Sequence, residues 1–354
     1  MKKITFVTSK IHGGGSENVL KLISEKLANL GYNISIIILN DSKRKIKPNS
    51  KINYFFYKNS KLSVNSKIIL NLKKILFIRS LIKNHQPNVV FSFITETNVL
   101  TIISCIFLQC KIITSERNDI EKQQKSKAWV LLAYIFYRYS DIITANSHKS
   151  VIFLKKKFTN KNIKFLPNPV KEIKRLKIKK KKVILCIAKF ENQKAHEVLI
   201  KAFAKGKFYT NGWKLKLIGE GSLKEKLKNE VEKLSISNFV VFKPYCEDLS
   251  KEMSQAFMIV LPSKYEGMPN IILESALLKI PFIISDSCDE VIRIFGKKNI
   301  VTFANNNLDS LKNALSELIK SKKTRTQINN NYDTMIRDFN NTKISRYWER
   351  IIFN

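Results

Sequence analysis

Short apolar runs alternate along this chain with longer stretches in which apolar residues recur every three or four positions. The short runs are nearly continuous in Ile, Val, Leu and Phe, which is typical of parallel strands covered on both faces. The longer stretches have the spacing of helices. The predicted strands are residues 4–8, 34–39, 88–93, 111–114, 141–145, 163–166, 183–187, 215–218, 239–242, 257–261 and 281–285. The predicted helices are one that ends at Leu30 ahead of Gly31, and residues 60–85, 99–108, 127–139, 197–204, 270–280, 308–320 and 340–353.

A lysine-rich segment divides this pattern into two series. Residues 171–182 read KEIKRLKIKKKK, and a run of this kind is typical of a solvated linker. A chain of 354 residues is long enough for two domains. Strands and helices alternate on both sides of the linker, so the pattern predicts the α/β class, with two Rossmann-like domains built on parallel sheets.

The helix predicted over residues 60–85 has an unusual mixture of side chains. Apolar residues at helical spacing are interleaved with basic ones. One interpretation is a helix that packs on the sheet and keeps a solvated basic face. The other is a surface that docks on anionic lipid, and the two are compatible. The apolar set is Ile68, Ile69, Leu72, Ile75, Leu76 and Ile82, and the basic set is Lys67, Lys73, Lys74, Arg79 and Lys83.

The aromatic and apolar stretch 127–139 is a second candidate for a membrane-facing or acceptor-side helix. The competing interpretation places it in the core.

Charge is the one compositional feature that departs from an ordinary globular protein. The formal net charge is +36, which favours polyanionic partners: nucleic acid, an anionic membrane surface or phosphorylated ligands. A compositional bias of the source toward Lys, Ile and Asn is an alternative origin for part of this charge.

The five cysteines form no C-x-x-C pair, and most lie in apolar runs, as expected for reduced thiols in a cytoplasmic protein. With four scattered histidines the sequence predicts no metal site. It also predicts no signal peptide, because the first apolar run is too short, and no transmembrane helix.

Two glutamates carry the sharpest chemical signal. Glu266 falls on the loop between a predicted strand and a predicted helix, and Glu274 falls in the second turn of that helix. A helix N-terminus offers free N–H groups to an anion, and a carboxylate can accept hydrogen bonds from sugar hydroxyls. The pair therefore suits a nucleoside diphosphate. The alternative is a polar loop followed by one solvated helix glutamate.

Two cations follow the strand 183–187. Lys189 comes directly after it, and Lys194 lies five residues later, before the next helix. Cations at a strand end suit a diphosphate. The alternative is that they are simply two of many lysines.

Polar loops also follow strands of the first half. Gly14 and Gly15 allow the backbone to approach a ligand, and Ser16 can cap the helix that follows. Glu116 and Arg117 follow the strand 111–114, at the edge where open α/β sheets bind ligands. The alternatives are a flexible turn for the glycines and a weak surface ion pair for the two charged residues.

The segment S-x-Y-E-G-x-P-N-x-x-x-E-S, residues 263–275, resembles the E-x7-E signature of the family 4 glycosyltransferases, which have the GT-B fold. The loop with Gly14, Gly15 and Glu17 resembles their G-G-x-E loop, and Ser115–Asn118 resembles the S-E-R-N loop of members that often handle N-acetylated hexosamines. Two departures are visible: no histidine lies near Ser115–Asn118, and Lys189 stands where the family commonly has arginine.

The resemblance implies two domains facing each other across a cleft: residues 1–168 on the acceptor side, residues 169–335 binding the nucleotide sugar, and residues 336–354 as a helix returning to the first domain. It implies that Glu274 binds the ribose, that Glu266 lies near the phosphates and the transferred sugar, and that Lys189 and Lys194 bind the diphosphate. The implied catalytic residues are Glu266, Lys189, Lys194, Glu116 and Arg117. The implied donor-binding residues are Gly14, Gly15, Glu17, Lys189, Lys194, Gly219, Tyr245, Glu266, Gly267, Met268, Pro269, Asn270, Ile271 and Glu274.

The function expected from the resemblance is a retaining transfer from a nucleotide sugar, with UDP and an N-acetylhexosamine as the favoured donor. The acceptor is expected to be a saccharide or lipid-linked saccharide in bacterial glycan assembly. No cofactor or obligatory metal is expected, and the location is cytoplasmic and peripheral at the inner, anionic face of the membrane. The alternatives are a nucleotide-sugar epimerase or a phosphorylase on the same scaffold. A nucleic-acid-binding protein is a third, although no finger, RNP motif or regular aromatic–basic groove supports it.

Overall fold

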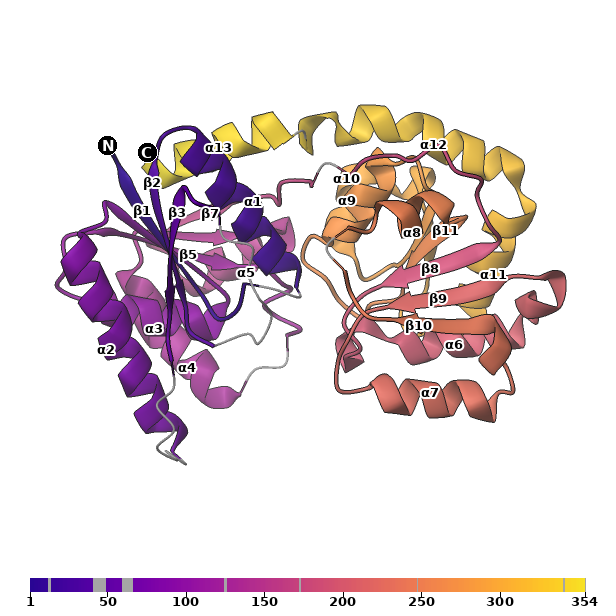
Figure 1. The fold of residues 1–354 in the computed structure, drawn as a ribbon, viewed down its shortest axis with the longest axis horizontal. Helices are drawn as coiled ribbons and strands as arrows, with labels where there is room; N and C mark the ends of the chain where they lie inside the picture. The colour runs from indigo at the N-terminus through magenta and orange to yellow at the C-terminus, as the bar shows by residue number, and fades with distance from the viewer. Residues whose placement is uncertain are drawn as a thin grey trace. The chain divides into compact units, whose positions relative to one another are not determined.

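The computed structural model describes residues 1–11, 14–40, 49–58, 66–123, 126–171, 173–246, 248–339 and 341–353 (Figure 1). The chain divides into two compact units. Unit 1 comprises Met1–Pro169 with Thr342–Asn354, and unit 2 comprises Val170–Asn341. Both are layered α/β structures, as the alternating pattern predicts.

Unit 1 is built on a parallel sheet of seven described strands in the order β3-β2-β1-β4-β5-β6-β7. The order reverses direction between β1 and β4, which makes this pair of strands the topological switch point of the sheet. The strands are β1 (Lys3–Thr8), β2 (Asn33–Ile38), β3 (Ile52–Phe56), β4 (Val89–Phe93), β5 (Lys111–Glu116), β6 (Ile142–Ala145) and β7 (Asn162–Phe165). The helices are α1 (Gly15–Asn29), α2 (Lys67–His85), α3 (Thr95–Cys105), α4 (Lys127–Phe136), α5 (His148–Lys157) and α13 (Asn341–Phe353), with a 3₁₀ turn at Tyr137–Tyr139.

Unit 2 is built on a parallel sheet of six described strands in the order β10-β9-β8-β11-β12-β13, with its switch point between β8 and β11. The strands are β8 (Val183–Ile187), β9 (Lys214–Ile218), β10 (Val240–Lys243), β11 (Met258–Leu261), β12 (Phe282–Ser285) and β13 (Val301–Phe303). The helices are α6 (His196–Lys205), α7 (Lys224–Lys233), α8 (Ser250–Gln255), α9 (Asn270–Leu277), α10 (Asp289–Phe295), α11 (Leu308–Lys320) and α12 (Lys322–Ile336). Short 3₁₀ turns occupy Asn192–Lys194, Phe208–Asn211, Ser237–Phe239, Lys297–Asn299 and Arg337–Phe339.

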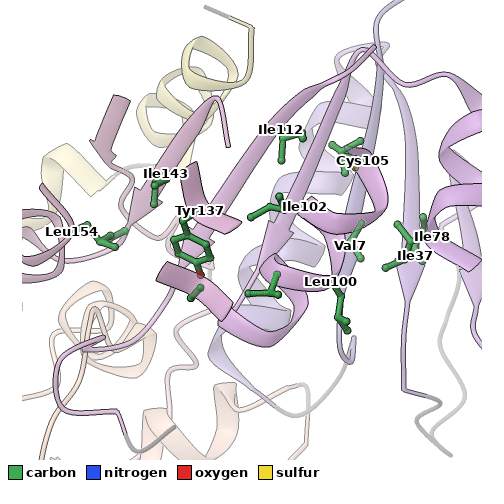
Figure 2. Packing of buried hydrophobic residues seen from close by; sticks show 14 of the residues in the cluster. Val7, Ile37, Ile78, Leu100, Ile102, Cys105, Ile112, Tyr137, Ile143 and Leu154 are labelled. Carbon is green, nitrogen blue, oxygen red and sulfur yellow. The ribbon is translucent and has the colours of Figure 1, made fainter. Parts of the chain in front are cut away.

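The sheet of unit 1 buries a different core on each face. Successive side chains of a strand point to opposite faces. Val90 of β4 therefore joins the aliphatic cluster shared with α2, α3, α4 and α5 (Figure 2). Phe91, the next residue, stacks on Trp348 of α13 with ring centroids 5.4 Å apart. The Trp348 indole N–H also donates to the Pro167 carbonyl at 2.9 Å, so the end of the chain is anchored on unit 1.

Helix α2 presents a face to the solvent that the sequence pattern assigned to the core. Its buried residues are Lys74, Ile78 and Ile82, whereas Ile68 is 73% exposed and Leu76 is 66% exposed. The prediction that the apolar residues of this helix pack inward is correct for Ile82 but wrong for Ile68, Ile69, Leu72 and Leu76. Periodicity showed which residues share a face, but the packing of α2 against α3 decides which face is covered. Residues 60–65 of the predicted helix lie outside the described residues.

Helix α4 is also more exposed than a core helix. Ala133 is its buried residue, and Val130, Leu131 and Tyr134 are each more than half exposed. The interpretation of this stretch as core is therefore wrong for its outer face. Among the described residues, no helix has both the length and the apolar character needed to cross a bilayer.

Candidate active site

The switch point of unit 2 brings two predicted signals together. Lys189 and Lys194 follow β8, and Glu266 follows β11, the strand beside β8 in the sheet. The two loops are joined directly. The Gln193 side-chain amide donates to the Tyr265 carbonyl at 2.8 Å, and the Lys264 amide donates to the Gln193 carbonyl at 2.8 Å. Open α/β sheets bind ligands at this place.

Lys194 and Glu266 form an ion pair. The Lys194 Nζ lies 2.5 Å from the Glu266 Oε1, and the Glu266 side chain is only 8% exposed. A pair this sheltered is costly to split, because each charge is left with little water around it. Any anion that takes Lys194 as a ligand must therefore displace or share the carboxylate.

Lys189 has a different environment. Its side chain is half-buried, and its ammonium makes no hydrogen bond or ion pair with the residues that the structure describes. The loop that carries it is fixed instead through its backbone: the Phe190 amide donates to the Glu220 carbonyl at 2.9 Å. This leaves a positioned cation available to a ligand.

Gly219 explains why that loop can lie so close to its neighbour. A Cβ at this position would stand 2.0 Å from the Ala188 carbonyl oxygen, a distance that real Cβ atoms do not reach. The sequence predicted Gly219 as a donor-binding residue. The structure gives it a packing role in holding the turn just before Lys189.

Glu274 lies in the second turn of α9 and is 7% exposed. Its carboxyl group makes no hydrogen bond with the described residues. Burial raises the pKa of this carboxyl to about 7, against the opposing effect of the Lys171 charge. A buried acid without a hydrogen-bond donor is unfavourable for the fold. The Glu274 carboxyl group can therefore still accept hydrogen bonds from the hydroxyl groups of a ligand.

The start of α9 provides the backbone part of the site. Gly267, Met268 and Pro269 are buried and lead into the helix, and Asn270 and Ile271 of its first turn are partly exposed. The first N–H groups of a helix have no partner within it and favour an anion. Tyr245, half-buried, follows β10 on the same carboxyl edge of the sheet.

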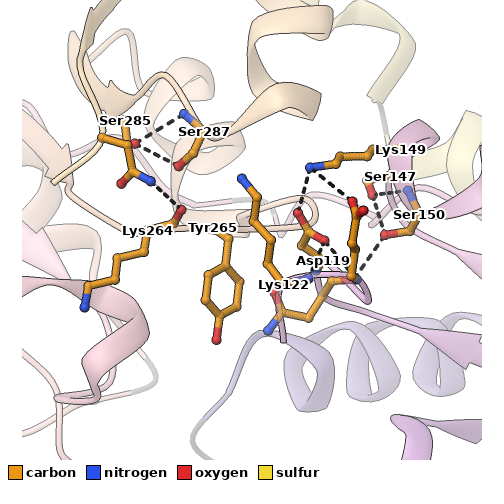
Figure 3. Close-up of polar contacts among 12 residues, drawn as sticks. Asp119, Lys122, Ser147, Lys149, Ser150, Lys264, Tyr265, Ser285 and Ser287 are labelled. Atoms are coloured by element: carbon orange, nitrogen blue, oxygen red, sulfur yellow. Dashed lines mark hydrogen bonds and ion pairs between the residues drawn. The ribbon is translucent and has the colours of Figure 1, made fainter. Parts of the chain in front are cut away.

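A serine network supports the loop before α9 (Figure 3). The Ser285 and Ser287 hydroxyls lie 2.8 Å apart, and Ser287 also donates to the Ser263 carbonyl at 3.4 Å. The side-chain N–H of Asn305 donates to the Lys264 carbonyl at 3.1 Å. These contacts hold the backbone that leads to Glu266.

In unit 1 the Glu17 side chain lies against Gly14, at the start of α1. Glu17 is buried in the first turn of α1, and a Cβ on Gly14 would lie 2.1 Å from its carboxylate. The prediction that Ser16 caps the helix is wrong: Gly14 is the N-cap, Gly15 begins α1, and the Ser16 hydroxyl donates to the Glu17 carboxylate at 2.8 Å. A side chain at position 14 would therefore require the Glu17 carboxylate to move.

Glu116 is engaged inside unit 1. The strand β5 extends two residues beyond its predicted end, so Glu116 is part of the sheet and is 1% exposed. It accepts hydrogen bonds from Thr95 at 2.6 Å and from the Tyr137 hydroxyl. Burial, together with the neighbouring Glu116 charge, raises the pKa of Tyr137 well above its usual range.

Arg117 is also engaged there. Its guanidinium lies 4.5 Å from the Trp348 ring centroid, and its Nη1 donates to the Leu166 carbonyl at 2.7 Å. Burial lowers the pKa of Arg117 to about 9. The interpretation of Glu116 and Arg117 as a surface ion pair is therefore wrong, and their catalytic role stays a prediction.

The next residues, Asn118 and Asp119, are tied to α5 (Figure 3). The Asp119 carboxylate accepts the backbone N–H groups of Glu121 and Lys122, each at 3.1 Å, and lies 3.4 Å from the Lys149 ammonium. The predicted S-E-R-N loop is thus a rigid corner of unit 1.

His196 was not singled out by its sequence context. It opens α6, is 2% exposed and packs edge-on against Phe190, and neither ring nitrogen has a hydrogen-bond partner among the described residues. Burial and the Lys194 charge lower its pKa to about 3, so the ring is neutral at physiological pH. Its one sequence signal was its position directly after Lys194-Ala195.

Comparison with known proteins covers both units. Residues 13–172 match the family model described as Glycosyltransferase Family 4, and residues 169–335 match Glycosyl transferases group 1. The chain belongs to the family 4 glycosyltransferases of the GT-B fold. It is therefore a transferase enzyme, as the E-x7-E segment and the two Rossmann-like units predict.

Full-length relatives support this assignment. An uncharacterised glycosyltransferase of Haemophilus influenzae is 25% identical over 99% of this chain and 100% of its own length. An α-1,4-N-acetyl-D-galactosaminyltransferase of Campylobacter jejuni, named for a GalNAc-containing diphospho-undecaprenol acceptor, is 23% identical over 99% of this chain and 98% of its own. The structure of Anabaena Alr3699/HepE with UDP-glucose superposes with a TM-score of 0.80 at 15% identity, covering 99% of each chain, which shows the shared fold.

Proposed function

We propose that this glycosyltransferase takes a sugar from a UDP-linked donor and transfers it to a saccharide or lipid-linked saccharide in bacterial glycan assembly. The observation that carries the proposal is the set of groups around the start of α9. Within the described part of the chain, the Lys189 ammonium has no partner, Lys194 is held 2.5 Å from Glu266, and Glu274 is a buried acid without a hydrogen bond.

These groups match the parts of a nucleoside diphosphate. The diphosphate takes the two lysines and the free N–H groups of α9, and the ribose hydroxyls donate to Glu274. Positive charge at the diphosphate stabilises the negative charge that develops on it as the sugar leaves. Because the lysines and the helix terminus supply that charge, the proposal includes no obligatory metal ion. It includes retention at the anomeric carbon on the strength of the family resemblance.

Two similarities support the finer identity of the substrates. The Ser115–Asn118 corner resembles that of transferases acting on N-acetylated hexosamines. The Campylobacter relative is named for an N-acetylgalactosamine transfer to a diphospho-undecaprenol acceptor. The proposed donor is accordingly a UDP-N-acetylhexosamine, and the proposed acceptor is a lipid-linked saccharide.

A lipid-linked acceptor fits the exposed apolar faces of unit 1. Helices α2 and α4 both lie against α3 (Figure 1). Each exposes apolar side chains to solvent. Ile68, Leu72 and Leu76 form a stripe on α2 at positions i, i+4 and i+8. Lys67 and Lys127 are exposed at the starts of the two helices. Apolar residues bordered by cations suit an anionic bilayer surface, so the proposal includes a peripheral position at the cytoplasmic face of the membrane.

Nucleotide-sugar binding is the first test. UDP and a panel of UDP- and GDP-sugars are added to the purified protein, and the melting temperature is followed. UDP-N-acetylhexosamines should raise it most. No shift with any nucleotide would refute the donor site.

Release of free UDP that depends on an added acceptor identifies transfer, whereas interconversion of the donor without an acceptor identifies an epimerase. Chelation with EDTA should leave the rate unchanged, and the anomeric configuration of the product, read by NMR, tests retention.

Membrane docking is tested separately by flotation with vesicles. We expect binding to vesicles of 30% phosphatidylglycerol in phosphatidylcholine, and its loss when Ile68, Leu72 and Leu76 are all replaced by serine. Leu30→Ser, which removes an exposed leucine after α1, is the matched control and should float as the native protein does. Equal flotation of the triple variant would exclude α2 as the docking surface.

A further inference from the structure

A polar cluster at the carboxyl edge of the sheet in unit 1 is unexplained by the donor site. It is centred on Lys74, which the sequence grouped with the solvated lysines of α2. The structure instead buries this side chain to 8% exposure, on the same face of the helix as Ile78 and Ile82. Its ammonium donates to the Asn40 side-chain oxygen at 2.7 Å, its one hydrogen bond within the described chain.

The cluster continues across the ends of two strands. Asn40 follows β2, and its side-chain N–H donates to the Ser9 hydroxyl at 2.7 Å. Ser9 follows β1, and the Asn40 backbone N–H donates to its carbonyl at 2.8 Å. The lysine, amide and hydroxyl therefore form a connected row at the carboxyl ends of β1 and β2.

Glu96 lies on the other side of the switch point and makes no direct contact with this row among the described residues. It is exposed in the first turn of α3, after β4, and its negative charge acts on the Lys74 ammonium. Burial lowers the pKa of Lys74, and the Glu96 charge opposes that change.

Backbone strain marks the same turn. Ile94, which precedes α3, has φ 72° and ψ 139°, a conformation that a β-branched residue rarely adopts. It is held there because its N–H donates to the Ser115 carbonyl at 2.9 Å and its carbonyl accepts the Asn98 N–H at 2.8 Å. Strain of this kind gathers at ligand-binding sites and is kept where the surroundings enforce it.

We propose that Ser9, Asn40, Lys74 and Glu96 form a subsite that holds a sugar ring of the acceptor. The row lies at the β1/β4 switch point, where α/β sheets bind ligands. It offers an ammonium with two further protons, an amide, a hydroxyl and a carboxylate, which together can both donate to and accept from ring hydroxyls. One cation and one anion balance each other, so a neutral saccharide suits the cluster better than a diphosphate does. A plain structural strut is a weaker explanation, because an apolar side chain of similar size at position 74 would hold α2 with less desolvation cost.

This inference rests on the proposed function, since it assumes that unit 1 receives a saccharide. Its test measures saccharide binding directly. The probes are octyl α-glycosides of N-acetylgalactosamine, N-acetylglucosamine, galactose and glucose, added to the full chain saturated with UDP. Their affinity is measured by saturation-transfer NMR titration. We expect at least one of them to bind with millimolar affinity or better, and Lys74→Met to weaken that binding about tenfold.

Two further variants separate binding from folding. Lys73→Met changes the neighbouring, half-buried lysine of α2 and should bind the glycoside as the native protein does. Glu96→Gln changes an exposed side chain, so it should fold normally and still weaken the glycoside several-fold. The UDP-induced rise in melting temperature should be the same in all three.

The outcomes are distinct. Unchanged glycoside affinity in Lys74→Met and Glu96→Gln, or no glycoside bound by the native protein, would overturn the subsite. A lower melting temperature of Lys74→Met with unchanged glycoside affinity would make the lysine a strut. Absence of the UDP shift in the native protein would instead overturn the proposed donor site.

Discussion

The ammonium of Lys194 and the carboxylate of Glu266 lie 2.5 Å apart, although both are expected to serve one ligand. The contact joins the loop after β8 to the loop after β11, the two strands that flank the switch point of unit 2. The Glu266 carboxylate thus neutralises the cation that we propose for the diphosphate. If Lys194 binds the diphosphate as proposed, donor binding exchanges one anion for another on Lys194 and leaves the Glu266 carboxylate available to the transferred sugar.

The first prediction concerns this exchange. Glu266→Gln removes the competing charge but keeps the shape of the side chain. We expect UDP to bind several-fold more tightly, because Lys194 is no longer neutralised, and transfer to slow by roughly a hundredfold if Glu266 acts on the reacting sugar. Calorimetric titration with UDP and steady-state transfer rates measure the two effects.

A matched ion pair elsewhere in unit 2 provides the control. Lys216 of β9 and Glu252 of α8 also lie 2.5 Å apart with comparable burial, and Glu252 pairs with Lys243 as well, at 2.7 Å. Glu252→Gln should change stability without changing UDP affinity or rate. Weaker UDP binding in Glu266→Gln would contradict the exchange, and an unchanged rate would remove Glu266 from the reaction.

The second prediction concerns the pH dependence of UDP binding. The Glu274 pKa is raised to about 7 by burial, and hydroxyl donors bind its ionised form. Binding should therefore weaken as pH falls through 7, with the affinity about tenfold lower at pH 6 than at pH 8. Titration of UDP itself adds a smaller dependence, so the measurement is repeated with Glu274→Gln. The variant should bind weakly and lose most of the dependence; a parallel pH profile in both proteins would exclude Glu274 as the titrating group.

The third prediction is that Glu274 destabilises the ligand-free fold. An acid whose folded-state pKa is raised from 4.5 to about 7 binds more protons folded than unfolded between these values, so the free energy of unfolding falls as pH rises through that window. The loss is about 3 kcal/mol, at about 1.4 kcal/mol per pKa unit. Glu274→Gln should melt at a higher temperature than the native protein at pH 8, and the difference should shrink toward pH 5. A melting-temperature difference that stays constant across that range would show that burial does not destabilise the ionised carboxylate.

The sequence predicted the positions of the charged residues of unit 2 better than it predicted the helix faces of unit 1, and the nucleotide-binding role of those residues stays a prediction. The sequence could predict where Glu266, Glu274 and Lys194 lie, because their order along strands and loops fixes their position on a parallel sheet. The Lys74 cluster could not be predicted from the sequence. Helical spacing gave α2 an apolar stripe, but it could not show that this stripe faces solvent and that Lys74 faces the core. Strand β3 and helix α7 were not predicted either, and neither was the strained Ile94, whose N–H donates to the carbonyl of Ser115, a residue distant in sequence.

The fourth prediction tests how α13 is held on unit 1. Trp348 is fully buried between the Phe91 ring and the Arg117 guanidinium and donates to the Pro167 carbonyl. Trp348→Ala removes a large core side chain and should lower the free energy of unfolding by about 3–5 kcal/mol in urea titrations. Tyr347→Phe, which deletes only a 3.0 Å hydrogen bond to the Phe165 carbonyl, should cost about 1 kcal/mol. Equal losses in the two variants would mean that the indole is not the anchor of the helix.

The last prediction connects a glycine to the donor site. Gly219→Ala places a Cβ where the Ala188 carbonyl now lies, at 2.0 Å, and the turn before Lys189 must move to make room. Overpacking of this kind typically costs about 1–3 kcal/mol, and the shift of Lys189 should weaken UDP binding several-fold.

Gly212→Ala is the control for this effect. Gly212 has φ 76° with no atom near its missing Cβ, so alanine there strains the backbone by about 1 kcal/mol and touches nothing. Both variants should melt at a lower temperature, but only Gly219→Ala should lose UDP affinity. If Gly212→Ala weakens UDP binding to the same extent, general destabilisation explains the loss, and the packing of Gly219 against Ala188 has no specific part in positioning Lys189.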